Sequence, residues 1–284
     1  MGRAVRFGVS IPSEEDSISK AASMGIEHVE LTFAPSPKGR IRAISRALRS
    51  AGVTAASYHG PFGLTYDIGN FNPKGRKEAL RKHREHLRYC AQLGAKCYVI
   101  HPGFESYGYG RGGKWNDEKK TGTLPREKST IGRLWETNAE SLAELADLAV
   151  DSGVSIALET GPSNMMTPAE TIRVVRMADR DNVGVCVDTG HVNVGGTITP
   201  ADAIRQAGRL LLSLHLNDNK GDGDFHFPPG KGSIDWIAVV RALRKVHYDG
   251  VLTLELGERK RREDVWGDVK TGITFLSEVF DRAR

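Results

Sequence analysis

The sequence predicts a (β/α)8 TIM barrel, an α/β fold in which eight parallel strands alternate with helices in a single domain over residues 1–284. Short β-branched segments alternate with amphipathic segments along the chain. Several amphipathic segments also end in a glycine just before the next strand. The length of 284 residues, 39% of them hydrophobic, suits one barrel-sized core or two smaller ones, but no linker, repeat or low-complexity tract favours a second domain.

Eight short segments have the apolar, β-branched composition of buried strands. They cover residues 5–10, 28–32, 53–59, 96–101, 154–159, 183–188, 211–216 and 249 or 250 to 255. We expect these strands to be parallel and buried on both faces, as they are in a barrel surrounded by helices.

The segments between the strands carry apolar residues at the i, i+3, i+4 spacing of amphipathic helices. The clearest of them are residues 16–25, 42–52, 78–94, 135–153 and 235–247. Gly25, Gly52, Gly94 and Gly153 close the first four of these segments. Glycine at that position favours the left-handed backbone conformation that ends a helix.

Residues 104–129 break the alternation, because they are polar and rich in glycine and charge where a connection is usually short. We expect a long loop after the fourth strand, either a lid over the site or a solvated insertion without a catalytic role. Tyr107 and Trp115 in this loop are candidates for covering a bound ring.

Composition and charge exclude some classes of protein. No apolar run approaches the roughly 20 residues of a membrane span, and the start MGRAVRFGVS lacks the apolar segment of a secretory signal. We therefore expect no membrane association and a cytoplasmic location. Cys90, Cys97 and Cys186 lack CxxC spacing and fit reduced core residues. The net charge of +5 is mildly basic, which would help an anionic substrate approach but does not indicate nucleic-acid binding.

Residues able to bind a metal stand where the third to eighth strands end, and the carboxyl ends of barrel strands form the active site in this fold. These residues are His59, His101, Glu159, Asp188 with His191, His215, and Glu255. The loop after the seventh strand adds Asp224 and His226, which are two residues apart and so point to one side of an extended segment. The remaining histidines fit structural roles; they are His28, His83, His86 and His247.

A single polar residue at a strand end could simply cap a turn. Nine carboxylates and imidazoles at one mouth would repel and desolvate one another unless cations lie between them. The mixed His and carboxylate set suits one to three ions of Zn²⁺, Mn²⁺ or Co²⁺, and the absence of Cys argues against a closed structural zinc site.

Three motifs carry a family resemblance: VGVCVDTGH (183–191), SLHLND (213–218) and DFHFPPGKGSIDW (224–236). With the strand-end set, they make the chain similar over nearly its whole length to the xylose isomerase-like TIM barrels (AP endonuclease family 2), a group of sugar-phosphate isomerases, sugar epimerases and endonuclease IV. In the epimerase branch, the resemblance implies one metal ion on Glu159, Asp188, His215 and Glu255. It also implies that Glu159 and Glu255 exchange the substrate proton, while the metal holds adjacent substrate oxygens and stabilises an enediolate.

The resemblance implies that His191 binds a substrate oxygen in the epimerase branch. From its place in the PPGKG loop, Lys231 is a second candidate for substrate binding, through an anionic group. The arginine that epimerases place shortly after the seventh-strand histidine is not evident in residues 217–220, which argues against the ketose-epimerase mode of substrate binding.

In the endonuclease IV branch, the resemblance implies that all nine residues bind three zinc ions. Glu159 would bridge an ion on His59 and His101 to one on Asp188, His215 and Glu255, and the third would lie on His191, Asp224 and His226. However, the first-strand loop GVSIPSEED lacks that family's HVSxxGG pattern. Phe62-Gly63 also stands where that family has a Tyr-Leu wedge, and glycine cannot fill the gap of an extruded nucleotide.

The sequence thus predicts a divalent-metal-dependent isomerase or epimerase acting on a small-molecule sugar or sugar phosphate. The alternative is an endonuclease IV-like trinuclear zinc phosphodiesterase that cleaves DNA at abasic sites, and only this alternative makes DNA a partner. A lyase or dehydratase, an inactive metal-binding barrel and a carbohydrate-binding protein stay open. The substrate, its stereochemistry, the metal and the oligomeric state also stay open.

Overall fold

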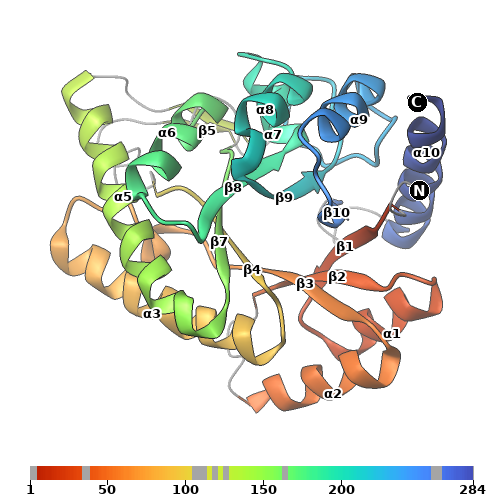
Figure 1. The fold of residues 1–284 in the computed structure, drawn as a ribbon, viewed down its shortest axis with the longest axis horizontal. Coiled ribbons are helices and arrows are strands. Elements are labelled where there is room, and N and C mark those ends of the chain that lie inside the picture. Colours follow the sequence, from red (N-terminus) through yellow and green to blue (C-terminus); the bar gives the residue numbers. More distant parts are fainter. Residues whose placement is uncertain are drawn as a thin grey trace.

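The computed structural model describes residues 5–33, 39–103, 114–116, 121–123, 128–161, 166–256 and 264–283. Eight parallel strands close into a barrel, and helices surround it on the outside (Figure 1). The strands follow the order β1-β10-β9-β8-β7-β4-β3-β2, so each lies beside the next barrel strand along the chain. The predicted (β/α)8 TIM barrel is confirmed.

Each predicted strand overlaps one barrel strand. The barrel strands are β1 (Phe7–Pro12), β2 (His28–Thr32), β3 (Thr54–His59), β4 (Cys97–Ile100), β7 (Ser155–Glu159), β8 (Val183–Asp188), β9 (Leu211–Leu216) and β10 (Leu252–Leu254). All six residues of β8 are buried, as expected for a strand covered on both faces.

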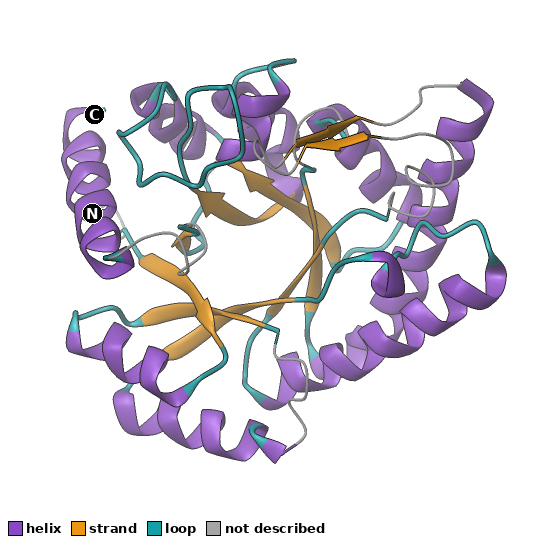
Figure 2. Cartoon of the chain, turned by 180° about the vertical axis from the view of Figure 1, so that it is seen from behind, coloured by secondary structure: helices purple, strands orange, loops and turns teal. Residues whose placement is uncertain are grey.

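The outer layer consists of helices, all but the last of which lie between successive barrel strands in the chain (Figure 2). They are α1 (Glu15–Ser23), α2 (Ile41–Ala51), α3 (Pro73–Gln92), α5 (Lys128–Ala149), α6 (Pro168–Ala178), α7 (Thr189–Gly195), α8 (Pro200–Ala207), α9 (Trp236–Lys245) and α10 (Val265–Arg282). Short 3₁₀ turns lie at η2 (Leu64–Tyr66), η3 (Val150–Ser152) and η4 (Gly208–Leu210). Gly52 and Gly153 adopt the left-handed conformation that the sequence predicts for them.

Helix α3 begins five residues before the predicted segment at Glu78. Its first turn has no apolar residue, but Asn72 caps it by accepting a hydrogen bond from Lys74 N, and Pro73 stands at the first helical position. The capping signal, and not the hydrophobic period, marks this helix start.

The long connection after β4 contains a short two-stranded antiparallel sheet, where only a loop was expected. Its strands are β5 (Lys114–Asn116) and β6 (Thr121–Thr123), and α5 follows from Lys128. Tyr107 and the side chain of Trp115 lie outside the described residues, so their proposed covering role stays a prediction.

The barrel contains two register irregularities that affect the site. Between β2 and β3, Val29 pairs with Ala55 but Glu30 pairs with Ser57, so Ala56 is an extra residue. Between β8 and β9, Val185 pairs with Leu211 but Cys186 pairs with Ser213. Such bulges re-aim the side chains that follow them.

None of the helices formed by the described residues is both long and apolar enough to cross a lipid bilayer.

Candidate active site

The structure brings all nine predicted residues together at the carboxyl ends of the strands. Ligand atoms lie within 4.8 Å of one another in each of four groups, three of which share members. We name three of them: the His59 group (His59, His101, Glu159), the His215 group (Glu159, Asp188, His215, Glu255) and the His226 group (His191, Asp224, His226). Glu159 belongs to the first two groups and therefore joins them.

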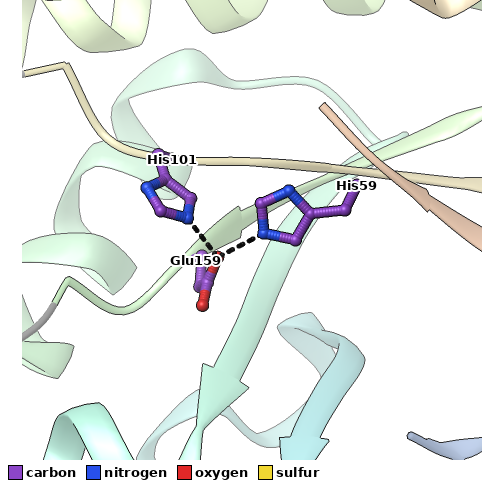
Figure 3. Close-up of side chains that lie close together, drawn as sticks. All are labelled: His59, His101 and Glu159. Atoms are coloured by element: carbon purple, nitrogen blue, oxygen red, sulfur yellow. Dashed lines mark ion pairs between the residues drawn. The ribbon is translucent and has the colours of Figure 1, made fainter. Parts of the chain in front are cut away.

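The His59 group is centred on one carboxylate oxygen (Figure 3). Glu159 Oε2 lies 3.0 Å from His101 Nε2 and 3.4 Å from His59 Nε2. His59 Nδ1 lies 2.8 Å from the carbonyl oxygen of Gly60, which can only accept, so Nδ1 carries a proton and Nε2 faces the group. Phe62 stacks on His101 with ring centroids 4.6 Å apart and is 52% exposed, so an apolar surface borders this group.

The His215 group arranges three carboxylates around one ring nitrogen. His215 Nδ1 lies 3.1 Å from Glu159 Oε1, 3.1 Å from Glu255 Oε2 and 3.8 Å from Asp188 Oδ2. His215 and Asp188 are fully buried, whereas the Glu255 side chain keeps 20% of its exposure. The group is therefore open to solvent on the side of Glu255.

The His226 group has two imidazoles on one carboxylate. Asp224 Oδ2 lies 3.2 Å from His191 Nε2, and Asp224 Oδ1 lies 3.2 Å from His226 Nε2. Each ring donates its Nδ1 proton to a carbonyl oxygen, from His191 to Thr160 at 2.8 Å and from His226 to Glu255 at 3.0 Å. Both Nε2 atoms therefore point at the carboxylate.

The local structure around Asp188 explains the DTGH sequence. Asp188 Oδ1 caps α7 by accepting from His191 N at 2.7 Å, and Oδ2 accepts from Asn217 Nδ2 at 2.8 Å. A Cβ at Gly190 would lie 1.8 Å from Asn217 Oδ1, so this approach of α7 to the end of β9 requires glycine. Asp188 is both a helix cap and a member of the His215 group, and these two roles do not compete.

Asp218 holds the loop that carries Asp224 and His226. Its fully buried carboxylate accepts from Gly230 N at 3.0 Å, from Ile234 N at 3.3 Å and from the Trp236 indole at 2.9 Å. His226 has a φ of 48°, a left-handed conformation that is uncommon for a residue other than glycine. The loop contacts thus hold the backbone of His226 in a conformation that a histidine would rarely adopt by itself.

Protons on the imidazoles balance the carboxylate charge in this arrangement. Burial favours neutral rings, but Glu159 raises the pKa of His59 to about 9, and Asp224 raises the pKa of His226 to about 10. Burial would also raise the pKa of Glu159, yet His101 and His215 hold it well below its usual range. Asp188 differs, because burial raises its pKa to about 6.

Buried oxygens without a hydrogen-bond partner also indicate a site for a divalent cation. Three buried carboxylate oxygens, Glu159 Oε2, Glu255 Oε2 and Asp224 Oδ1, lack a partner with hydrogen-bond geometry among the described residues. Glu159 Oε2 and Asp224 Oδ1 lie within ion-pair distance of imidazole nitrogens but off the direction of an N–H bond. Buried carboxylate oxygens that lack a hydrogen-bond partner and lie beside other His and carboxylate ligand atoms suit Zn²⁺, Mn²⁺ or Co²⁺.

The structure adds Glu30, which the strand-end reasoning missed because it lies in the middle of β2. This carboxylate is fully buried and lies 3.1 Å from His215 Nε2. An acidic residue within the apolar segment HVELT was the signal in the sequence. Lys231, the predicted anion contact, is exposed on its loop.

The other histidines lie outside the three groups. His83 and His86 are buried in α3, and each bonds a tyrosine through Nδ1: Tyr98 at 2.7 Å for His83 and Tyr58 at 2.9 Å for His86.

Curated relatives share this chain's sequence at low identity. A D-psicose 3-epimerase of Ruminiclostridium cellulolyticum is 27% identical over 267 residues, which cover 90% of this chain and 84% of the relative. An inosose isomerase of Bacillus subtilis is 25% identical, covering 75% and 74%. An uncharacterized protein of Methanocaldococcus jannaschii is 27% identical over 69% of this chain, and the match spans 62% of that relative.

Solved structures confirm the fold. A D-tagatose 3-epimerase-like protein superimposes with a TM-score of 0.78 at 23% identity, covering 98% of both chains. The IolI protein, in a structure with a bound zinc atom, gives a TM-score of 0.76 at 18% identity and covers 99% of both chains.

A family model of the xylose isomerase-like TIM barrel matches residues 18–278. This match covers nearly the whole chain, including every strand-end residue described above. The chain belongs to the xylose isomerase-like TIM barrel family.

Proposed function

We propose that the protein is a divalent-metal-dependent isomerase or epimerase that acts on a sugar or sugar phosphate by carboxylate-mediated proton transfer. The observation that carries this proposal is the His215 group, in which Glu159 and Glu255 both lie 3.1 Å from one imidazole nitrogen at the open end of the barrel. The names of the relatives, a psicose epimerase and an inosose isomerase, support the same class of reaction. They do not favour phosphodiester cleavage.

In this proposal Glu159, Asp188, His215 and Glu255 hold one divalent ion. A bound ion would neutralise the negative charge that develops on the substrate oxygens when a neighbouring carbon loses its proton. The His59 and His226 groups offer positions for further ions, so the number of ions lies between one and three.

Glu159 and Glu255 act as the acid/base pair. One carboxylate removes the carbon-bound proton and becomes protonated; the other first takes a proton from water and then returns it to the same carbon or to its neighbour. Both are ionised in the structure: burial raises the pKa of Glu255, but His215 more than offsets this and lowers it. A base must be ionised before it can accept the proton.

His191 and Lys231 are the proposed substrate contacts. His191 lies between the His215 and His226 groups, 3.3 Å from Glu159 Oε1 and 3.2 Å from Asp224 Oδ2. Lys231 is exposed on the loop that carries Asp224 and His226, so it is available to an anionic substituent. We place the reaction in the cytoplasm, which the free thiols of Cys90, Cys97 and Cys186 support.

Solvent exchange tests the chemistry directly. The metal-loaded protein is incubated in D₂O with a panel of ketohexoses, their phosphates and inososes, and deuterium at carbon is followed by NMR. We expect exchange in at least one substrate, and a loss of about 100-fold or more in Glu255→Gln, because general acid–base catalysis contributes that much.

Glu278→Gln is the matched control, since Glu278 is exposed and pairs with Arg282 far from the barrel mouth. Retained exchange in Glu255→Gln would remove Glu255 from the acid/base role. Absence of exchange by the wild-type protein across the panel would contradict the proposed reaction.

A further inference from the structure

The orientation of His215 differs from that of three other histidines at the site. His59, His191 and His226 each direct Nδ1 to a backbone carbonyl and Nε2 toward a carboxylate of a candidate metal group. His215 is reversed, because Nδ1 faces Glu159 and Glu255 while Nε2 faces Glu30. Among the described residues, no backbone carbonyl bonds this ring, so a side chain sets its direction.

Glu30 forms a close pair with that ring. Each of its carboxylate oxygens lies 3.1 Å from His215 Nε2, and the hydrogen-bond geometry selects Oε2. Glu30 Oε1 has no other hydrogen-bond partner among the described residues. The carboxylate and the ring are both fully buried, so water does not compete for this contact.

A second contact fixes the carboxylate. Ser57 Oγ donates to Glu30 Oε2 at 2.7 Å, and Ser57 is the residue that pairs with Glu30 after the extra residue Ala56 in β3. The irregular register between β2 and β3 therefore brings Ser57 level with Glu30. Bulges beside functional sites commonly re-aim a side chain in this way.

We infer that Glu30 is a positioning residue that holds the Nε2–H of His215 and so directs Nδ1 at Glu159, Asp188 and Glu255. A carboxylate can only accept, so Nε2 keeps its proton in this contact, and Nδ1 is the nitrogen that would give up its proton to bind an ion. In metal sites, such an outer carboxylate fixes the ring and strengthens the inner nitrogen as a ligand. This inference rests on the proposed function for its purpose, but the orientation of the ring can be measured without it.

The position of Glu30 argues against a direct role in binding the metal. The candidate groups among the described residues contain Glu159, Asp188 and Glu255, but not Glu30. Glu30 lies on the far nitrogen of His215, away from the carboxylates that Nδ1 meets. Its effect on the reaction therefore passes through the imidazole.

The test compares Glu30→Gln and Glu30→Leu with the wild type. Gln keeps the shape and one acceptor oxygen, whereas Leu removes the acceptor. Calorimetric titration with Mn²⁺ should give a dissociation constant that rises about 10- to 100-fold in Glu30→Leu, with a smaller rise in Glu30→Gln. Glu27→Gln is the matched control, since this exposed residue lies three positions away and also loses a charge.

A second readout needs no metal. ¹⁵N NMR of the metal-free protein at fixed pH detects the Nε2 proton of His215, which exchanges slowly with water while it is bonded to the buried Glu30 carboxylate. We expect slow exchange in the wild type and in Glu27→Gln, and faster exchange in Glu30→Leu. Ser57→Ala should also speed the exchange of this proton, and it replaces Glu30→Leu in the test if that variant fails to fold.

The outcomes separate the two proposals. The role of Glu30 would be overturned if both folded Glu30 variants bind Mn²⁺ with a dissociation constant within twofold of the wild type and the NMR signal of the His215 Nε2 proton is unchanged. If the wild type binds no divalent ion, the proposed function fails, and the ring signal alone decides whether Glu30 orients His215.

Discussion

Two buried histidines illustrate how contacts decide protonation. His59 and His83 are 4% and 1% exposed, so burial favours the neutral form of both rings. Glu159 raises the pKa of His59 to about 9, whereas burial lowers the pKa of His83 to about 4. His83 donates from Nε2 to the carbonyl of Tyr66 at 2.8 Å and accepts from Tyr98 at Nδ1, which satisfies a neutral ring.

His83 should make the protein sensitive to acid. Its folded-state pKa lies below the unfolded value of 6.5, so the unfolded chain binds more protons between these two values. The neutral His83 ring therefore contributes about 3 kcal/mol to the free energy of unfolding above pH 6.5, and this contribution is lost as the pH falls toward 4. Urea unfolding at a series of pH values should show that the free energy of unfolding depends less steeply on pH in His83→Gln than in the wild type between pH 4 and 6.5.

His247→Asn is the control for the pH series, because His247 is exposed and already adopts the left-handed conformation that Asn tolerates. Its profile should follow that of the wild type. An identical profile in His83→Gln would show that the ring is not held neutral in the folded protein.

At the scale of elements, the loop from Asn217 to Asp235 depends on one buried carboxylate. Asp218 accepts three backbone N–H groups and the Trp236 indole, and a Cβ at Gly232 would lie 2.1 Å from its Oδ1. A close-packed loop of this kind positions Asp224 and His226 without regular secondary structure of its own.

Replacing Asp218 with Asn should loosen this loop. One acceptor oxygen becomes a donor facing N–H groups, which costs roughly 1–3 kcal/mol. Hydrogen exchange should rise in residues 224–235 while β8 stays protected. Asp222→Asn, an exposed change in the same loop, should leave the exchange unchanged. Equal protection in both variants would mean that Asp218 does not hold the loop.

The elements differ in how far the sequence predicts them. The eight barrel strands follow from apolar runs, and their ends point to seven of the nine clustered residues because parallel strands share one mouth; the spacing in the loop after the seventh strand adds Asp224 and His226. Glu30 escapes that reasoning, since its contact with His215 joins residues 185 apart and depends on a bulge at Ala56. The β5–β6 pair was missed because a polar, glycine-rich segment carries no strand pattern.

For the whole molecule, the fold concentrates opposite charges that are far apart in the chain. Residues from the end of β3 to the end of β10 meet at one end of the barrel, where the ligand atoms of each His, Glu and Asp group lie within 4.8 Å of one another. Folding therefore assembles the site, and an ion that binds only the folded protein must stabilise it. We therefore propose that divalent cations bind among these groups.

The most direct test is the melting temperature of EDTA-treated protein, measured by calorimetry with and without Mn²⁺, Co²⁺ or Zn²⁺. An ion at 100 times its dissociation constant adds about 2.7 kcal/mol, which corresponds to a rise of about 5 °C for a chain of this size. We predict that rise with at least one of the three ions, and its loss in Asp188→Asn. An unchanged melting temperature with all three ions would contradict the account.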